Sequence, residues 1–202
     1  GFLGVLIPLK GVYELVEAMR ILVKERGLNV ECLIAGENAR EVSGLKALLL
    51  RKLGFARDVR GELSQLIEQH DLQEQVRLLG FVGDVRALYR RLDIICFPSH
   101  LDAAGRPVFE AAFYSIPSVV AVADPLPDSV IHGVTGLAVR GPDPVAIADA
   151  LQRLAEDPAY RRTLGLQARA WAEANFAVDR NALLMYEVYC RALSRSCVAT
   201  SD

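Results

Sequence analysis

The amino-acid sequence predicts an α/β fold, namely a doubly wound parallel sheet of about six strands followed by C-terminal helices. Two observations support this prediction. Short apolar runs rich in β-branched residues alternate with longer segments whose apolar residues recur at helical spacing. Hydrophobic residues make up 52% of the 202 residues and charged residues 24%, which is typical of a packed globular domain and not of a disordered chain.

The first half of the chain contains four apolar runs that we expect to form strands. They are Phe2–Ile7, Val30–Ala35, Val76–Leu79 and Ile94–Phe97. The expected helices between them cover residues 12–27, 40–71 and Val85–Arg91. Gly27 is a typical residue to end the first of these helices, and we expect Gly54 and Gly61 to interrupt the second.

The second half continues the alternation and then becomes helical. A helix is expected over Pro107–Ser115, and strands over Ser118–Ala123 and Gly136–Val139. The remaining helices are expected at 144–156, 158–175 and 177–194, with breaks at Asp157-Pro158 and Asn175-Phe176. At roughly 150 residues per domain, the chain is long enough for one domain. We expect that domain to cover residues 1–194, with 195–202 as a flexible tail.

Charge and composition exclude several classes of function. The 23 basic and 25 acidic residues give a net charge of −2, so the basic excess expected of a nucleic-acid-binding protein is missing. No apolar run reaches the roughly 18 residues of a transmembrane helix. Cys32 and Cys96 lie in apolar runs without metal-ligand spacing, which favours small buried hydrophobes in a reducing, cytoplasmic compartment.

In a doubly wound sheet, ligands bind beyond the carboxyl ends of the strands, so the loops that follow the strands are the candidate sites. None of these loops carries the glycine pattern of a dinucleotide-binding dehydrogenase or the P-loop lysine of an NTPase. The most informative loop runs from Pro98 into the helix that starts near Pro107.

The loop after residue 98 combines groups that suit a nucleotide. Gly105 permits close backbone approach, and the N–H groups of the following helical turn would attract an anion. Arg106 can grip a phosphate through two parallel hydrogen bonds. Glu110, about one turn into the helix, can accept hydrogen bonds from a vicinal diol such as a ribose. The alternative is that Glu110 only stabilises the first turn of the helix through the helix dipole and that Asp102 is an acidic loop residue without a specific role.

Other ionisable side chains give weaker signals. Lys10 lies where the loop after the first expected strand meets the first helix, and it could reach a phosphate as a point charge. The alternative for Lys10 is a solvated loop lysine. His70, His100 and His132 have no partners at metal-ligand spacing, and we expect each to be a surface histidine.

Six short motifs occur in an order that is recognisable. They are Gly-x5-Lys-Gly from Gly4, Ile-Ala-Gly, Leu-Gly-Phe-Val, Pro-Ser, Asp-x7-Glu and Thr-Gly-Leu. Together they resemble the carboxyl-terminal domain of GT4 glycosyltransferases, and the resemblance runs from Phe2 to about Leu193. It implies the Rossmann-like half of a GT-B fold. It also implies binding of a UDP- or GDP-sugar and transfer that retains the anomeric configuration without a metal ion.

The resemblance implies roles in catalysis for three residues. Asp102 matches the first acid of the family's paired-acid motif and would contact hydroxyls of the donor sugar. Lys10 matches the lysine that neutralises the diphosphate as it leaves. Arg106 lies in the loop that faces the diphosphate and the sugar.

The remaining matches imply contacts with the nucleotide. Glu110 matches the second acid of the motif, which holds the ribose hydroxyls. The resemblance implies that Gly4 and Gly105 lie in the loops that face the diphosphate. It implies that Phe81 and Val82 line the base and that Val108 lies on the apolar side of the nucleoside pocket.

Two departures from the family pattern keep other functions open. Val5 stands where the family often has arginine, and Asp102 is one methylene shorter than the usual glutamate. A catalytically degenerate sugar-nucleotide module and a nucleotide-sugar epimerase of the same fold are therefore alternatives.

The resemblance also implies partners that this chain does not contain. They are an amino-terminal domain and a glycan or lipid-linked acceptor, with a location in the cytoplasm or at the inner face of the membrane. This fragment alone is expected to be inactive. The helix at 177–194 would cross toward the amino-terminal domain in the family, although its apolar residues slightly favour packing on the present domain.

Overall fold

The computed structural model describes residues 1–39, 57–101, 103–125 and 129–198. It contains two three-stranded parallel sheets, of orders β1-β2-β3 and β4-β5-β6. Gly1 joins them, because its amino group donates to the Ile94 carbonyl at 2.7 Å and its carbonyl accepts from the N–H of Cys96 at 2.8 Å. The strands therefore follow the order β3-β2-β1-β4-β5-β6, which confirms the predicted doubly wound arrangement.

The strands occur where the sequence predicts them, and all are shorter except β3, which extends one residue further, to Gly80. Their bounds are β1 Phe2–Leu3, β2 Cys32–Ala35, β3 Val76–Gly80, β4 Ile95–Phe97, β5 Ser118–Val120 and β6 Gly136–Ala138. The expected first strand ends at Leu3, because Gly4 adopts a φ of 148° and Pro8 begins a 3-10 turn, η1 (Pro8–Lys10). The early end releases residues 4–11 to form a loop at the carboxyl edge of the sheet.

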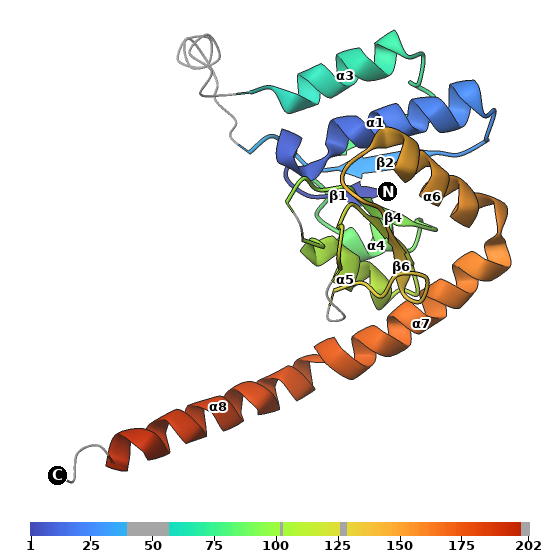
Figure 1. The fold of residues 1–202 in the computed structure, drawn as a ribbon. Helices are drawn as coiled ribbons and strands as arrows, with labels where there is room; N and C mark the ends of the chain where they lie inside the picture. The colour runs from blue at the N-terminus through green and yellow to red at the C-terminus, as the bar shows by residue number, and fades with distance from the viewer. Residues whose placement is uncertain (40–56, 102, 126–128, 199–202) are drawn as a thin grey trace, which may run out of the picture.

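Helices cover both faces of the sheet (Figure 1). One face carries α1 (Val12–Arg20, continued by the π-helical turn η2, Ile21–Glu25), α3 (Val59–Gln69) and α6 (Pro144–Glu156). The other carries α4 (Val85–Tyr89) and α5 (Arg106–Ala112), against which α7 (Pro158–Phe176) packs. The buried side chains of these faces, including Cys32 and Cys96 as predicted, form the core.

Aspartate side chains fix the starts of the helices. Asp58, Asp84, Asp143 and Asp157 each accept backbone N–H groups of the first turn of α3, α4, α6 and α7. Gly61 is one of these donors, so it belongs to the first turn of α3 and does not interrupt a helix as predicted. Gly54 and the rest of 40–56 lie outside the described residues.

The last helix, α8 (Val178–Val198), runs past its expected end and extends away from the domain (Figure 1). Its apolar side chains from Val178 to Leu193 are 50–81% exposed. The slight preference for packing on this domain is therefore wrong. The chain turns at Ala177, whose ψ of 130° is extended, while the preceding Phe176 stays packed on Trp171. No helix in the described ranges is both long and apolar enough to cross a membrane.

Candidate functional site

The loops that follow β1 and β4 lie against each other at the carboxyl edge of the sheet. The N–H of His100 donates to the carbonyl of Leu9 at 2.9 Å, and the buried hydroxyl of Ser99 donates to the same oxygen at 3.1 Å. Since the strand order reverses between β1 and β4, this is the position at which doubly wound sheets bind ligands. Ser99 is part of the Pro-Ser motif, but the motif predicted no role for its hydroxyl.

Gly11 allows these two loops to touch. It has a φ of 72° and precedes the first residue of α1, and a Cβ atom at this position would overlap the carbonyl oxygen of Pro98. Both the backbone conformation and the close approach require glycine. The loop that carries Lys10 is thus fixed at both ends, by Gly4 and by Gly11.

Two predicted site residues, Lys10 and Gly105, lie beside the ring of Phe97, and Gly4 lies next to Lys10. The ammonium of Lys10 lies 5.8 Å from the centre of this ring. A Cβ on Gly4 would lie 3.1 Å from the Lys10 Nζ, and a Cβ on Gly105 would overlap the Phe97 ring. Both glycines therefore make room for the lysine or its aromatic support. Burial, together with the positive charge of Arg106, lowers the pKa of Lys10 from its ordinary value of 10.5.

The first turn of α5 offers fewer N–H donors than the sequence predicts. Gly105 is the N-cap residue with extended backbone, Pro107 has no N–H, and the N–H of Val108 is bound to the Gly105 carbonyl at 2.9 Å. Attraction for an anion at this edge therefore comes mainly from the side chains of Lys10 and Arg106, and less from the helix terminus.

Glu110 points to the surface of the site and not into the apolar core. Its Oε1 lies 3.0 Å from the Nε of Arg106, and its Oε2 accepts a hydrogen bond of 2.7 Å from the hydroxyl of Tyr89. The Arg106 side chain is 88% exposed and that of Glu110 37%, whereas Tyr89 is 1% exposed. Burial first, and then the Glu110 carboxylate, raise the pKa of Tyr89 well above its usual range.

The other predicted residues are more dispersed. Phe81 is 83% exposed, and its N–H donates to the Glu37 carboxylate at 3.2 Å. Val82 packs against the apolar cluster that contains Tyr89. Val108 is buried in the main core. Asp102 lies outside the described residues, so its predicted position remains a prediction.

The three histidines each have a partner in the structure. His100 is 2.8 Å from the carboxylate of Glu14, and His70 is 2.7 Å from that of Glu17. The Nδ1 atom of His132 accepts the N–H of Ala138 at 3.0 Å. Within the described ranges, no three His, Cys, Asp or Glu side chains come together as metal ligands.

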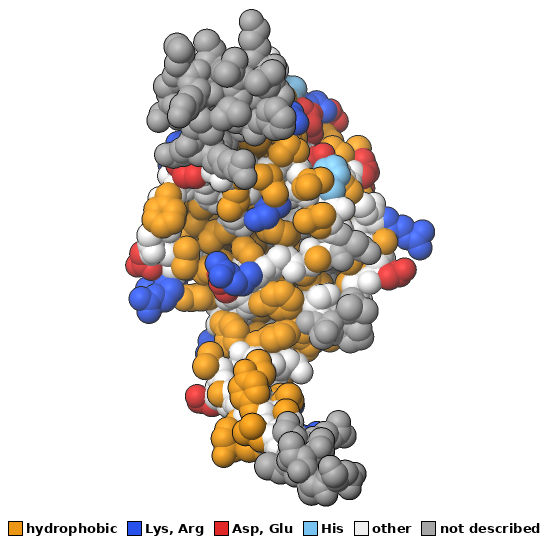
Figure 2. All heavy atoms as spheres, turned by 90° about the vertical axis from the view of Figure 1, so that its left-hand side faces the viewer, with side chains coloured by type: hydrophobic (Ala, Val, Ile, Leu, Met, Phe, Trp, Pro, Cys, Tyr) orange, Lys and Arg blue, Asp and Glu red, His pale blue; other side chains and the backbone are white. Residues whose placement is uncertain are grey.

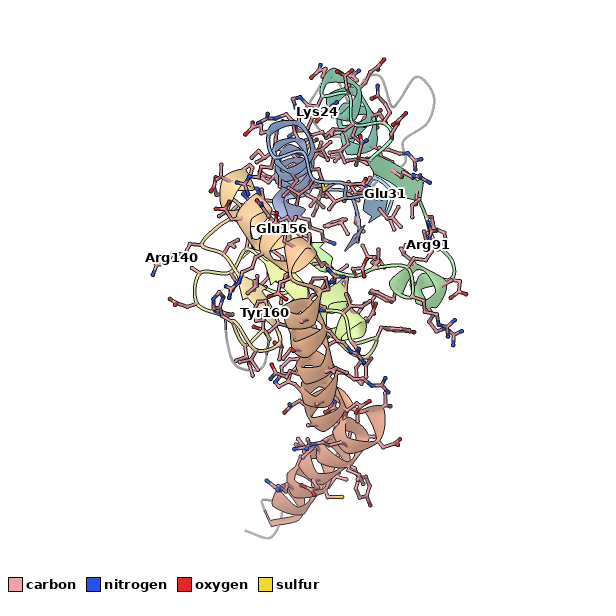
Figure 3. All side chains as sticks on the ribbon, turned by 90° about the vertical axis from the view of Figure 1, so that its right-hand side faces the viewer. Lys24, Glu31, Arg91, Arg140, Glu156 and Tyr160 are labelled. Carbon is pink, nitrogen blue, oxygen red and sulfur yellow. The ribbon has the colours of Figure 1, made fainter. Side chains whose placement is uncertain are left out.

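The two sides of the molecule differ. On the side where the β1 and β4 loops lie, separate basic side chains are surrounded by hydrophobic surface (Figure 2). A hollow of about 490 Å³ opens at the amino ends of the strands, with Glu31 and Arg91 at its rim (Figure 3). None of the predicted site residues lines this hollow.

Comparison with known proteins identifies relatives in sequence. The pattern of the family described as glycosyl transferases group 1 matches residues 1–171. The chain is 26% identical to the capsular polysaccharide biosynthesis glycosyltransferase CapM of Staphylococcus aureus over 179 residues, which is 88% of this chain and 42% of CapM. The chain thus spans less than half the length of this relative.

Solved structures share the fold. HepE of Anabaena, in complex with UDP, has a TM-score of 0.78 at 24% identity and covers 95% of this chain with 48% of its own. The C-terminal domain of the group 1 glycosyl transferase LpcC from Francisella tularensis has a TM-score of 0.72 at 24% identity, covering 88% of this chain and 85% of that domain. The chain belongs to the group 1 (GT4) glycosyl transferases and corresponds to the C-terminal domain of their GT-B fold.

Proposed function

We propose that this chain is the donor-binding domain of a retaining glycosyltransferase that takes a hexosyl group from a UDP- or GDP-sugar. The observation that carries the proposal is the convergence of two cations and one carboxylate at the edge between β1 and β4. Lys10 lies close enough to Arg106 for the charge of Arg106 to lower the pKa of Lys10, and Arg106 contacts Glu110. A nucleoside diphosphate presents the matching groups, an anion beside a diol.

Each part of the donor then has a place. The diphosphate lies between Lys10 and Arg106, so Arg106 supplies the second cation that Val5 does not. As the sugar leaves, these charges stabilise the growing negative charge on the diphosphate. Glu110 holds the ribose hydroxyls, and Asp102 contacts the donor sugar. Gly4 and Gly105 leave room for Lys10 and the Phe97 ring beside the diphosphate. Phe81 and Val82 line the base, and Val108 supports the nucleoside pocket from the core.

The whole enzyme requires a second half for the acceptor. This chain spans 42% of CapM and 48% of HepE, and we propose that the other half binds a glycan or lipid-linked acceptor and covers the apolar side of α8. We propose that the reaction takes place in the cytoplasm or at the inner face of the membrane. We also propose that it needs no metal ion, since Lys10 and Arg106 would neutralise the diphosphate. HepE structures that hold UDP or UDP-glucose support UDP as the first ligand to test.

A thermal shift measurement on this chain tests donor binding. UDP or GDP at one hundred times its Kd stabilises the folded form by about 2.7 kcal/mol. For a chain of this size, this stabilisation raises Tm by about 5–10 °C. ADP serves as the comparison for the base. Melting curves that stay unchanged with millimolar UDP, GDP and ADP would contradict the proposal.

Replacing Lys10 with alanine is expected to weaken UDP binding by about 10- to 100-fold, because one charge-assisted phosphate contact is lost. Binding of uridine, which has no phosphate, should change by less than about threefold. Lys24 is the matched control, because this exposed lysine lies in η2, at the far end of the helix that follows the Lys10 loop (Figure 3). Calorimetric titration of both variants gives the two affinities, and equal losses for UDP and uridine would exclude a phosphate contact.

The affinity for UDP is also expected to depend on pH. It should fall as the pH rises, and the fall should begin at a pH below 10.5, the ordinary pKa of lysine. The sign follows from the proton, because the diphosphate attracts only the charged form of Lys10 and burial with Arg106 lowers its pKa in the free protein. Lys10→Arg keeps the charge at these pH values. The ratio of the UDP affinities of the wild type and Lys10→Arg cancels the effect of uracil ionisation, which is the same for both proteins. If this ratio does not change with pH, Lys10 does not contact the diphosphate.

A further inference from the structure

We propose that Tyr89 is a positioning residue that orients the Glu110 carboxylate for the two hydroxyls of the donor ribose. The inference rests on the proposed function and adds to it a residue that no sequence motif indicated. Tyr89 lies in α4, between β3 and β4, and its hydroxyl reaches across to the Oε2 of Glu110 in α5 at 2.7 Å.

The two partners of Glu110 hold it in different ways. Tyr89 is buried, and its ring stacks on that of Tyr114 with 5.3 Å between the centres, so its hydroxyl has little freedom to move. The guanidinium of Arg106 is almost fully exposed and can exchange Glu110 for a phosphate at small cost. When Arg106 turns to the diphosphate, Tyr89 is the contact that keeps the carboxylate in place.

The hydrogen-bond capacity of the carboxylate fits this role. An ionised carboxylate accepts about four hydrogen bonds, two on each oxygen. Tyr89 occupies one position on Oε2, which leaves positions on both oxygens for two neighbouring hydroxyls once Arg106 has moved. Because Tyr89 is a neutral donor whose pKa is raised, it remains protonated and leaves the negative charge of Glu110 intact for the ribose.

Comparison of UDP with 2′-deoxy-UDP by calorimetry tests this role. The wild-type chain is expected to prefer UDP by about tenfold, since one hydroxyl bonded to a charged group is lost in the deoxy ligand. In Tyr89→Phe the preference should fall below about threefold, and the affinity for 2′-deoxy-UDP, which keeps the 3′-hydroxyl, should fall less than the affinity for UDP. Tyr114→Phe, which removes a hydroxyl from the neighbouring ring, should keep the wild-type preference.

Two further outcomes separate this inference from the proposed function. If the wild-type chain binds neither nucleotide, the proposed function itself fails. If it binds UDP with the expected preference and Tyr89→Phe retains that preference, only the role of Tyr89 is refuted. In a Glu110→Ala background, Tyr89→Phe should leave the affinity for UDP unchanged, because Tyr89 acts through Glu110. An equal loss in both backgrounds would instead indicate a general structural effect and overturn the proposal.

Discussion

Glu110→Ala is expected to weaken the binding of UDP by about 100-fold, because the ribose loses two hydrogen bonds to a charged group. The same variant should bind UDP and 2′-deoxy-UDP almost equally. The substitution also leaves the buried hydroxyl of Tyr89 with only the carbonyl of Pro107, at 3.5 Å, as an acceptor, so a loss of about 1–3 kcal/mol in the free energy of unfolding should accompany it. Calorimetric titration and chemical denaturation measure the two effects separately.

The control for Glu110 is Glu173 in α7. Its Oε1 lies 2.7 Å from the Nε of Arg169 at the same four-residue spacing as Arg106 and Glu110, and the pair is exposed. Glu173→Ala therefore removes a comparable helical ion pair away from the β1 and β4 loops. It should leave UDP affinity within about twofold and stability within about 0.5 kcal/mol. If Glu110→Ala behaves like this control, Glu110 does not hold the ribose.

Gly11→Ala is expected to lower the stability of the domain by roughly 3 kcal/mol or more. An alanine must adopt a φ of 72°, and its Cβ overlaps the Pro98 carbonyl oxygen. Either the loop after β1 or that after β4 must move, and both belong to the site. We therefore expect Tm to fall by about 6–12 °C and UDP binding to be lost with it.

Gly27→Ala separates the two causes of this loss. Gly27 has a φ of 66°, but no atom lies within 4 Å of the position that its Cβ would occupy. Gly27→Ala should therefore lower the free energy of unfolding only through the left-handed backbone, by about 1–2 kcal/mol. A loss for Gly11→Ala no larger than that for Gly27→Ala would show that the two loops do not meet as closely as the structure indicates.

The parts of the fold that could be predicted from sequence depend on local patterns. Apolar periodicity located the strands and helices, and Asp-Pro at 157–158 located the start of α7. The end of β1 could not be predicted in this way, because the apolar run continues to Ile7, while β1 ends at Leu3 and only a single bridge, between Leu6 and Asn38, follows. The direction of α8 depends on a single turn at Ala177, which has no distinctive sequence.

The candidate site was predictable where topology brings its loops together. Lys10 and Gly105 both follow strands, and in a doubly wound sheet such loops meet at one edge. The pairing of Arg106 with Glu110 follows from their four-residue spacing on one helix. Tyr89 was missed because it contacts Glu110 from another helix, 21 residues away in the sequence. The first turn of α5 has few free N–H groups in part because the N–H of Val108 bonds to the Gly105 carbonyl, and the sequence does not indicate this bond.

The joint at Gly1 gives a bound nucleotide an effect beyond its immediate contacts. Hydrogen bonds of Gly1 to Ile94 and Cys96 link the two half-sheets there. A ligand held by Lys10, which follows β1, and by Glu110, which follows β4, would connect the two half-sheets and slow their local separation. Deuterium uptake at the Cys96 amide, which donates to Gly1, should then slow when UDP is present, whereas amides at the exposed end of α8 should exchange at the same rate.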